Sequence, residues 1–307
     1  MNIQGSKNSR FFGQSAVNSD RENSEALRAK SLVEYVSGVI DGDGNFDIRN
    51  IRSSSGLVYR KLKSIRIKMQ NRDIRVLAKV KDFLRCGRLN SNKSLVTYQI
   101  STEQEMIRVV RLLNGHIRLK TVNFKEACQL FGIEYIEANY TIESNSKYLC
   151  GLIDTDGSIG YNYQKNNICL SLELKDNEQS RRLNLDHAIP EFKPKTYFLQ
   201  KRNQSARKIF YSTRFVWQNS NNTIWLYEYA CKNRLFSDFK FYRFMQIKRF
   251  VEIKHFKNAK KGSDEHLVYS KWVIDFMSHL NPKFQRVTYH NKLSFPQQDS
   301  KDYEKVQ

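Results

Sequence analysis

Hydrophobic and polar positions alternate along this chain in two ways, one typical of amphipathic helices and the other of half-buried strands. A helical face is clearest at Val36, Val39 and Ile40, and strand alternation is clearest over 65–70. In the first half the patterns predict, in order, a helix ending near residue 43, strands at 46–51 and 58–69, a helix at 73–84, strands at 88–90 and 95–101, and helices from residue 102 and over 121–131. This order is typical of an α+β fold.

The second half of the chain repeats that order. Its patterns predict strands at 159–163 and 168–174, a helix at 177–185, strands at 196–202 and 208–217, and helices at 223–230, 238–254 and 267–280, the last without a counterpart. We therefore expect two half-domains, 25–135 and 145–290, joined by a linker at 136–144. Residues 1–24 are rich in Ser, Asn and Gln and predict a mobile tail, and 291–307 predict a disordered one.

A short motif occurs once in each half. Residues 35–45 read Y-V-S-G-V-I-D-G-D-G-N, and residues 148–158 read Y-L-C-G-L-I-D-T-D-G-S. Gly38 and Gly151 lie inside the predicted helices, where a glycine costs about 1 kcal/mol relative to alanine. The same cost at matching places predicts that the two helix backbones pack closely there. Ser31 and Glu34 have the spacing of a capping box, which predicts that the first helix begins there.

The net charge of the chain limits the classes of function that the sequence favours. The 307 residues include 52 Lys and Arg against 31 Asp and Glu, a net charge of +21. Such a charge predicts a polyanionic partner, nucleic acid first, with a ribosomal or membrane-surface protein as the alternative. No apolar run approaches the roughly 18 residues that span a membrane. The five cysteines are odd in number and form no C-x-x-C pair, which argues against a zinc site or a disulfide framework.

The paired motif, in a basic chain, resembles the signature of the LAGLIDADG homing endonucleases in their single-chain, two-motif form. The resemblance covers both motifs and, more loosely, residues 31–285. It implies a duplicated αββαββα fold in which two four-stranded sheets form DNA-binding saddles around a central pair of motif helices. It also implies a monomeric, intron-encoded, site-specific endonuclease that cuts double-stranded DNA, encoded in the mitochondrion or, alternatively, the chloroplast.

Two other functions stay open. The same family includes RNA maturases, which assist splicing of their own intron RNA, and the sequence does not separate the two activities. A non-cleaving DNA-binding regulator on the same fold is a further alternative. The presence of both Asp43 and Asp156 weighs against it, because a regulator has no use for paired metal ligands.

The motif carboxylates are the candidate metal site. If the two helices pack side by side, Asp43 and Asp156 emerge at the same end, and two close carboxylates repel unless a cation lies between them. Oxygen ligands without His or Cys favour Mg²⁺, with Mn²⁺ as a substitute. A calcium loop is excluded, because its sixth and twelfth positions hold Phe46 and Arg52 in place of Gly and Glu.

The resemblance assigns the metal ligand to the second acidic residue of each motif, which is Asp43 or Asp156. The carbonyl groups of Gly42 and Thr155 are additional candidate ligands. Asp41 and Asp154 are expected to serve in helix-end hydrogen bonding and charge balance.

Four further polar residues are candidates for catalysis. The resemblance places a lysine near the attacking water and the scissile phosphate. Lys120 precedes the last predicted helix of the first half, and Lys240 occupies a similar place in the second half. The alternative for each is an ordinary solvated lysine. Gln70 and Lys175, at the ends of matching second strands, are candidates for the network of hydrogen-bonded water.

Strand alternation selects the candidate DNA contacts, because one face of each sheet packs on helices and the other stays open. In the first half these are Asn45, Asp47, Arg49, Arg66, Lys68, Arg88, Asn90, Thr97 and Gln99, and in the second Ser158, Asn162, Ser171, Glu173, Gln200, Arg202, Ser212 and Arg214. A solvated face is the alternative, which the net charge disfavours. Since the halves differ at most of these positions, we expect an asymmetric target of about 20 bp, two turns of duplex.

Overall fold

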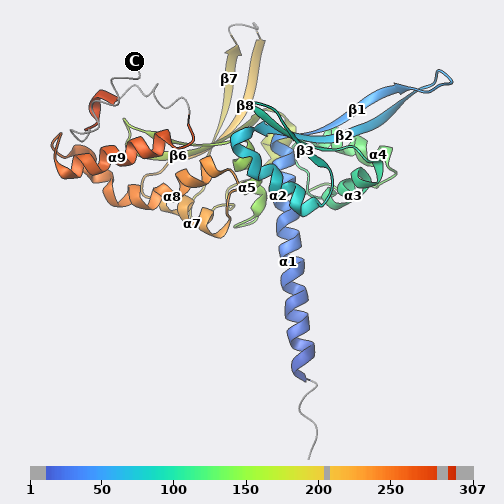
Figure 1. Ribbon diagram of the computed structural model, residues 1–307, viewed down its shortest axis with the longest axis horizontal. Helices are drawn as coiled ribbons and strands as arrows, with labels where there is room; N and C mark the ends of the chain where they lie inside the picture. Colours follow the sequence, from blue (N-terminus) through green and yellow to red (C-terminus); the bar gives the residue numbers. More distant parts are fainter. Residues whose placement is uncertain (1–11, 204–207, 282–289, 295–307) are drawn as a thin grey trace, which may run out of the picture.

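Two four-stranded antiparallel sheets dominate the molecule (Figure 1). The computed structural model describes residues 12–203, 208–281 and 290–294. The strand order is β1-β2-β4-β3 in the first sheet and β5-β6-β8-β7 in the second. The two halves thus repeat one topology, and the predicted α+β class and duplicated order are confirmed.

The first half follows the predicted order closely. Its elements are α1 (Phe12–Asp43), β1 (Gly44–Arg52), β2 (Val58–Gln70), the short 3-10 helix η1 (Asn71–Asp73), α2 (Ile74–Leu84), β3 (Arg88–Ser91), β4 (Leu95–Ile100), α3 (Glu103–Leu113) and α4 (Thr121–Leu130). Apolar residues on one side of each strand, such as Ile65, Ile67 and Met69 of β2, are buried against the helices. The other side of the sheet stays open.

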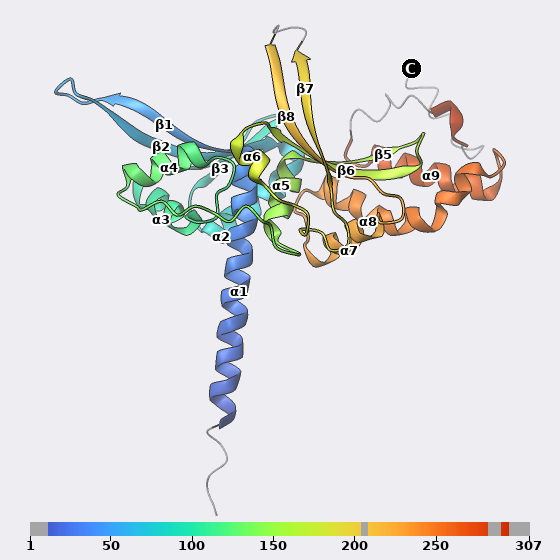
Figure 2. The same ribbon diagram turned by 180° about the vertical axis from the view of Figure 1, so that it is seen from behind.

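The second half adds one helix. Its elements are α5 (Lys147–Asp156), β5 (Gly157–Asn162), β6 (Asn167–Lys175), α6 (Glu178–Arg182), β7 (Lys195–Asn203), β8 (Lys208–Trp217), α7 (Ile224–Lys232), α8 (Asp238–Ile253), η2 (Lys254–Asn258), α9 (Asp264–Ser278) and η4 (His290–Lys292). Helix α9 is the predicted extra helix, and Trp272 and Phe276 on it pack on Tyr161 of β5. The hairpin of β7 and β8 projects beyond the body of the molecule in both views (Figures 1 and 2).

The motif helices α1 and α5 cross at the centre, as their glycines predict. A Cβ atom built on Gly38 would lie 2.2 Å from the carbonyl oxygen of Tyr148, and one built on Gly151 would lie 2.3 Å from that of Tyr35. Only glycine permits this approach, since real Cβ atoms keep well beyond 3 Å. The buried side chains around this crossing join the cores of the two halves into one continuous core.

The structure corrects the predicted ends of the chain. Helix α1 begins at Phe12 and runs unbroken through Ser31, so residues 12–24 are helical and the helix start predicted at the capping box of Ser31 and Glu34 is wrong. Once a helix is nucleated by packing, each added residue gains a hydrogen bond, and the segment 21–32 is rich in good helix formers. The beginning of α1 extends away from the body of the molecule (Figure 2). Residues 1–11 lie outside the described part of the chain.

At the other end, the disordered tail expected from 291 is contradicted over 291–294. Leu293 and Ser294 are buried, and the Ser294 hydroxyl lies 2.7 Å from Nδ1 of His266 on α9. Residues 295–307 lie outside the described part of the chain. None of the described helices is long and apolar enough to cross a membrane.

Candidate functional site

The two motif helices end side by side, and each ends on a candidate metal ligand. Asp43 is the last residue of α1 and Asp156 the last of α5. A Cβ atom built on Gly42 would lie 2.0 Å from Thr155 Oγ1 and 3.1 Å from Asp156 Oδ2. The close crossing of the helices therefore brings the two carboxylates to one place, at the junction of the two sheets.

Burial dominates the electrostatics of this pair. It raises the pKa of Asp156 to about 6, and the nearby negative charge of Asp43 adds to the rise, while Lys240 and Lys120 oppose it. Burial likewise raises the pKa of Asp43, and the same two lysines oppose the rise. Both carboxylates thus resist being charged together, as expected of a pair that a divalent cation would neutralise.

The donor set is small. No cluster of three or more His, Cys, Asp or Glu side chains suited to a metal occurs in the described residues. A metal at the seam would rest on the side chains of Asp43 and Asp156 and on water or phosphate oxygens. Such an all-oxygen set fits Mg²⁺, which keeps several waters and uses one or two protein carboxylates.

The other motif carboxylates, Asp41 and Asp154, accept hydrogen bonds from the backbone just before a later helix of the same half. Asp41 accepts the backbone N–H groups of Arg118, Leu119 and Lys120, at 2.7, 3.0 and 3.0 Å, just before α4. Asp154 accepts those of Phe236 and Ser237, at 2.8 and 3.0 Å, just before α8. Their predicted role as hydrogen-bond acceptors at helix ends is confirmed, although the helix each one serves is the later one.

Each of these carboxylates also reaches across the pseudo-twofold axis. The Tyr148 hydroxyl donates to Asp41, and the Tyr35 hydroxyl donates to Asp154, both at 2.8 Å. The first tyrosine of each motif therefore holds the aspartate of the other. These reciprocal bonds fix the register of α1 against α5.

Both candidate lysines lie at the site, where they bind the motif backbone. Lys120 Nζ donates to the carbonyl oxygens of Gly42, at 2.8 Å, and of Gly44. Lys240 Nζ donates to the carbonyl oxygens of Ile153, Asp154 and Thr155, each at 2.8 Å.

These bonds occupy the carbonyl groups of Gly42 and Thr155, the additional candidate metal ligands. Each carbonyl oxygen already accepts from a lysine ammonium, so a metal there would meet a like charge. Gln70 and Lys175 are exposed at the ends of β2 and β6. No hydrogen bond joins either to the aspartates or lysines of the site in the described residues.

Sequence reasoning missed one buried charge beside this site. Asp73, the last residue of η1, is 6% exposed, and its Oδ1 accepts the Ser237 hydroxyl at 2.5 Å. Its charge raises the pKa of Asp43. Nothing in the local pattern distinguishes Asp73 from an ordinary residue at a helix start, because its partner lies in the other half of the chain.

In the first sheet, the predicted contact residues share the open face. The register aligns Asn45, Arg66, Gln99 and Arg88 in one row across all four strands, and Lys68, Thr97 and Asn90 in the next. Asp47 lies on the same face, with Arg49 at 2.8 Å and Arg66 at 3.0 Å. The carboxylate thereby holds two arginines in place on an open, basic surface.

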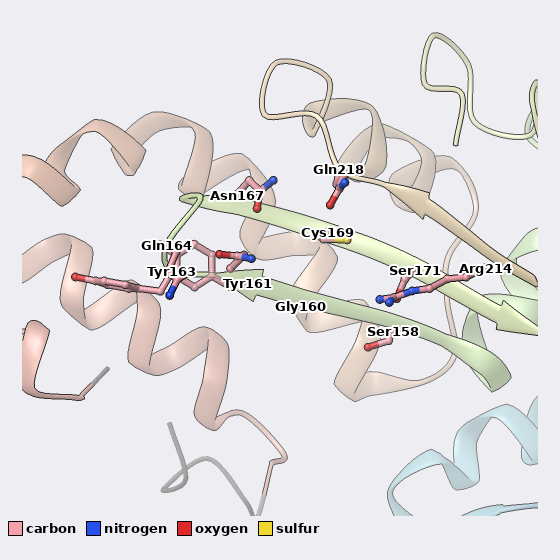
Figure 3. Close-up of a pocket in the computed structure, with 11 residues that line it drawn as sticks. Ser158, Gly160, Tyr161, Tyr163, Gln164, Asn167, Cys169, Ser171, Arg214 and Gln218 are labelled. Atoms are coloured by element: carbon pink, nitrogen blue, oxygen red, sulfur yellow. The ribbon is translucent and has the colours of Figure 1, made fainter. Parts of the chain in front are cut away.

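In the second sheet, most of the predicted contact residues also share one face. The register pairs Ser158 with Ser171 and Glu173 with Arg214, and Glu173 accepts the hydroxyl of Ser212 at 2.8 Å. Figure 3 shows a hollow of about 500 Å³ on this face, with Ser158, Ser171 and Arg214 gathered at one end. Asn162 also lines the hollow.

One predicted contact of the second half is on the wrong face. Gln200 pairs with Tyr211, so it does not share the face of Arg214, while the side chain of Arg202 lies outside the described part of the structure. A one-residue change of register moves every side chain of a strand to the other face, and the sequence between β7 and β8 did not fix the register. Lys195, Tyr197, Leu199 and Lys201 are residues of β7 on the Arg214 face.

The comparisons with known proteins agree with this geometry. The model of the LAGLIDADG endonuclease family matches residues 36–131. The intron-encoded DNA endonuclease ai2a of Dictyostelium discoideum is 24% identical over 269 residues, which cover 85% of this chain and 80% of that protein. The intron-encoded RNA maturase bI4 of Saccharomyces cerevisiae is 29% identical over 133 residues, 42% of this chain and 19% of that protein.

Solved structures show the same fold at low identity. The LAGLIDADG homing endonuclease I-GzeII, in complex with its DNA target, superposes with a TM-score of 0.55 at 12% identity, covering 80% of this chain and 98% of that one. Meganuclease I-SmaMI, bound to uncleavable DNA, gives a TM-score of 0.50 at 13% identity, covering 74% and 90%.

Proposed function

The chain belongs to the LAGLIDADG endonuclease family, and from that premise we propose that it is an intron-encoded, site-specific endonuclease that cuts both strands of DNA. The observation that carries this proposal is the junction of Asp43 and Asp156 at the seam between two open sheets. A duplex lying along both sheets would pass directly over the paired carboxylates. One molecule then holds two carboxylates for two strands, as a monomer with internal pseudo-twofold symmetry.

Asp43 and Asp156 would hold the divalent cation, Mg²⁺ with Mn²⁺ as a substitute. When bound, such a cation stabilises charge on the attacking and leaving oxygens of phosphodiester hydrolysis. Lys120 and Lys240 hold the ends of the motif helices through their carbonyl groups, which keeps the carboxylates in place. Asp41 and Asp154 keep those two lysine-bearing segments docked.

The DNA would be read by the open faces. Arginine, asparagine and glutamine can each make two hydrogen bonds to a purine in the major groove, and the row of Asn45, Arg66, Gln99 and Arg88 presents all three types. The open face of the second sheet carries Ser158, Ser171, Arg214 and Tyr197. Because the two rows differ, the proposed target is asymmetric, about 20 bp long at ~10.5 bp per turn.

The names of the relatives support a proposal about the intron and the compartment. Three similar proteins are named as intron-encoded, two of them as endonucleases. We propose an organellar intron as the source of this chain and the mitochondrion as its place of action. RNA maturation is the second candidate function, and the similarity to maturase bI4 favours it. Binding of the host intron RNA and accelerated splicing would support that second function.

Cleavage of a plasmid library with randomised inserts tests the endonuclease proposal. With Mg²⁺ the purified chain should linearise a small fraction of the plasmids, and sequencing of the cut ends should give one asymmetric site. Chelation by EDTA should abolish the cut. Intact plasmids at every Mg²⁺ and Mn²⁺ concentration, from a library that covers all sites of this length, would overturn the proposal.

A further inference from the structure

The two lysines of the site use their protons differently. An ammonium group has three N–H donors. Lys240 Nζ donates all three to carbonyl groups near the end of α5. Lys120 Nζ makes two such bonds, to Gly42 and Gly44, in the described residues, which leaves one donor for water or phosphate. The two halves of the site are therefore not equivalent copies.

A contact between the halves accompanies this difference. Ser237, just before α8, is fully buried and donates its hydroxyl to Asp73 of the first half at 2.5 Å. The Arg72 guanidinium lies 4.3 Å from the ring centre of Phe239, and Arg75 lies 2.6 Å from Asp238. The start of α8, which carries Lys240, is thus held by η1 and α2 of the other half.

In the described residues, no hydrogen bond or ion pair from the turn after β6 reaches the segment that carries Lys120. The carboxylates at the corresponding place in the second half are Asp176 and Glu178, which follow β6 as η1 follows β2. Asp176 accepts from Arg181 and Thr213, both in its own half, each at 2.8 Å. Glu178 is 75% exposed and 4.0 Å from Arg182.

The acidic residues that act on the two lysines also differ between the halves. Burial lowers the pKa of Lys240, and Asp154, Asp73, Asp156 and Asp43 oppose the change. Burial also lowers the pKa of Lys120, but the carboxylates that oppose it all belong to the motifs. Among the described residues, Asp73 is thus the acidic residue outside the motifs that acts on one of these lysines and not on the other.

We propose that Asp73 is a positioning residue that fixes Lys240 against the end of α5 through Ser237, so that the two DNA strands are cut by inequivalent centres. Asp73 touches neither DNA nor the reacting atoms. Asp73 fixes the position of the start of α8. Because Lys240 on α8 binds the carbonyl groups at the end of α5, Asp73 also fixes the position of these groups beside Asp156. This inference rests on the proposed endonuclease function.

Strand-resolved cleavage tests the proposal. The selected target carries a different label on each strand, and single-turnover rates of the two cuts are measured for wild type, Asp73→Asn and Lys120→Met. The Lys120→Met variant identifies the strand that depends on Lys120. Asp73→Asn should slow the other strand by about tenfold, because misplacing a reacting group by ~1 Å costs up to about 100-fold. Nicked DNA should accumulate, with DNA affinity unchanged.

Asp82→Asn is the matched control, since Asp82 lies on α2 with its side chain 74% exposed. It should cut both strands like wild type. Equal slowing of both strands by Asp73→Asn, or no slowing, would overturn the proposal. Asp73→Asn removes the charge of the acceptor but keeps an oxygen there, whereas Ser237→Ala removes the hydrogen bond itself. Ser237→Ala must therefore show the same strand preference, and it replaces Asp73→Asn if that variant does not fold. A wild type that cuts no DNA would instead refute the proposed function.

Discussion

At the scale of single residues, the raised pKa of Asp156 makes the stability of the metal-free protein depend on pH. Burial and the charge of Asp43 raise that pKa from 3.8 to about 6. Between these values the folded chain binds a proton that the unfolded chain releases. The free energy of unfolding contributed by Asp156 therefore falls as pH rises through this window.

We predict that wild type loses stability relative to Asp156→Asn between pH 5 and pH 7, by on the order of 1 kcal/mol, since one pKa unit corresponds to about 1.4 kcal/mol. Thermal melts of both proteins in EDTA at the two pH values measure the difference. Comparing the two proteins cancels the titration of groups that do not interact with Asp156, such as Asp176, whose hydrogen bonds with Arg181 lower its pKa to about 2. A difference that stays constant, or that changes in the opposite direction, would contradict the buried, coupled carboxylate pair.

The sequence predicted those residues of the site that the motif repeats. Asp43 and Asp156 are visible because the same letters occur twice, and Lys120 and Lys240 because they occupy similar places at the starts of late helices, Lys120 just before α4 and Lys240 in the first turn of α8. Asp73 has no repeated counterpart, and its partner Ser237 lies far away along the chain. A contact between distant segments leaves no periodic signal in one sequence, so only the fold reveals it.

At the scale of elements, the glycines of α1 and α5 set the geometry of the site. We predict that Gly38→Ala lowers both the melting temperature and the cleavage rate. The new Cβ atom would lie 2.2 Å from the Tyr148 carbonyl oxygen, so the helices must separate. Overpacking of this kind costs about 1–3 kcal/mol, which exceeds the ~1 kcal/mol that alanine gains in helix propensity.

Gly160→Ala is the control for this substitution. A Cβ atom on Gly160, in β5, would meet nothing within 4 Å, so its melting temperature should stay near that of wild type. Gly38→Leu should be worse than Gly38→Ala. A Gly38→Ala protein that melts and cuts like wild type would show that the two backbones do not touch there.

The elements themselves were largely predictable, and their exceptions have local causes. Strands and helices followed from the alternation of apolar residues, which burial on one face imposes. The start of α1 did not follow from this alternation. Its segment is polar and has no apolar face, and it becomes helical as an extension of a packed helix. The orientation of the Gln200 side chain could not be predicted either, because the alternation in β7 gives a period but not a register.

At the scale of the whole molecule, two sheets with different faces flank one seam. The first face carries charged and amide side chains, whereas the second carries hydroxyl groups, an exposed Tyr197 and the Glu173–Lys201 pair. The net charge of +21 favours a phosphate backbone along both. Duplication of the half-domain thus explains the pseudo-symmetric centre. Because the two open faces differ, we expect them to bind an asymmetric target.

The central claim is that Asp43 and Asp156 serve the chemistry and not the binding. The most direct measurement pairs a gel-shift titration with a cleavage assay, on one selected target with Mg²⁺, for wild type, Asp43→Asn and Asp156→Asn. We expect each variant to bind DNA with an affinity within a few-fold of wild type and to make no double-strand break. A variant at either position that binds normally and still cuts both strands at the wild-type rate would contradict it.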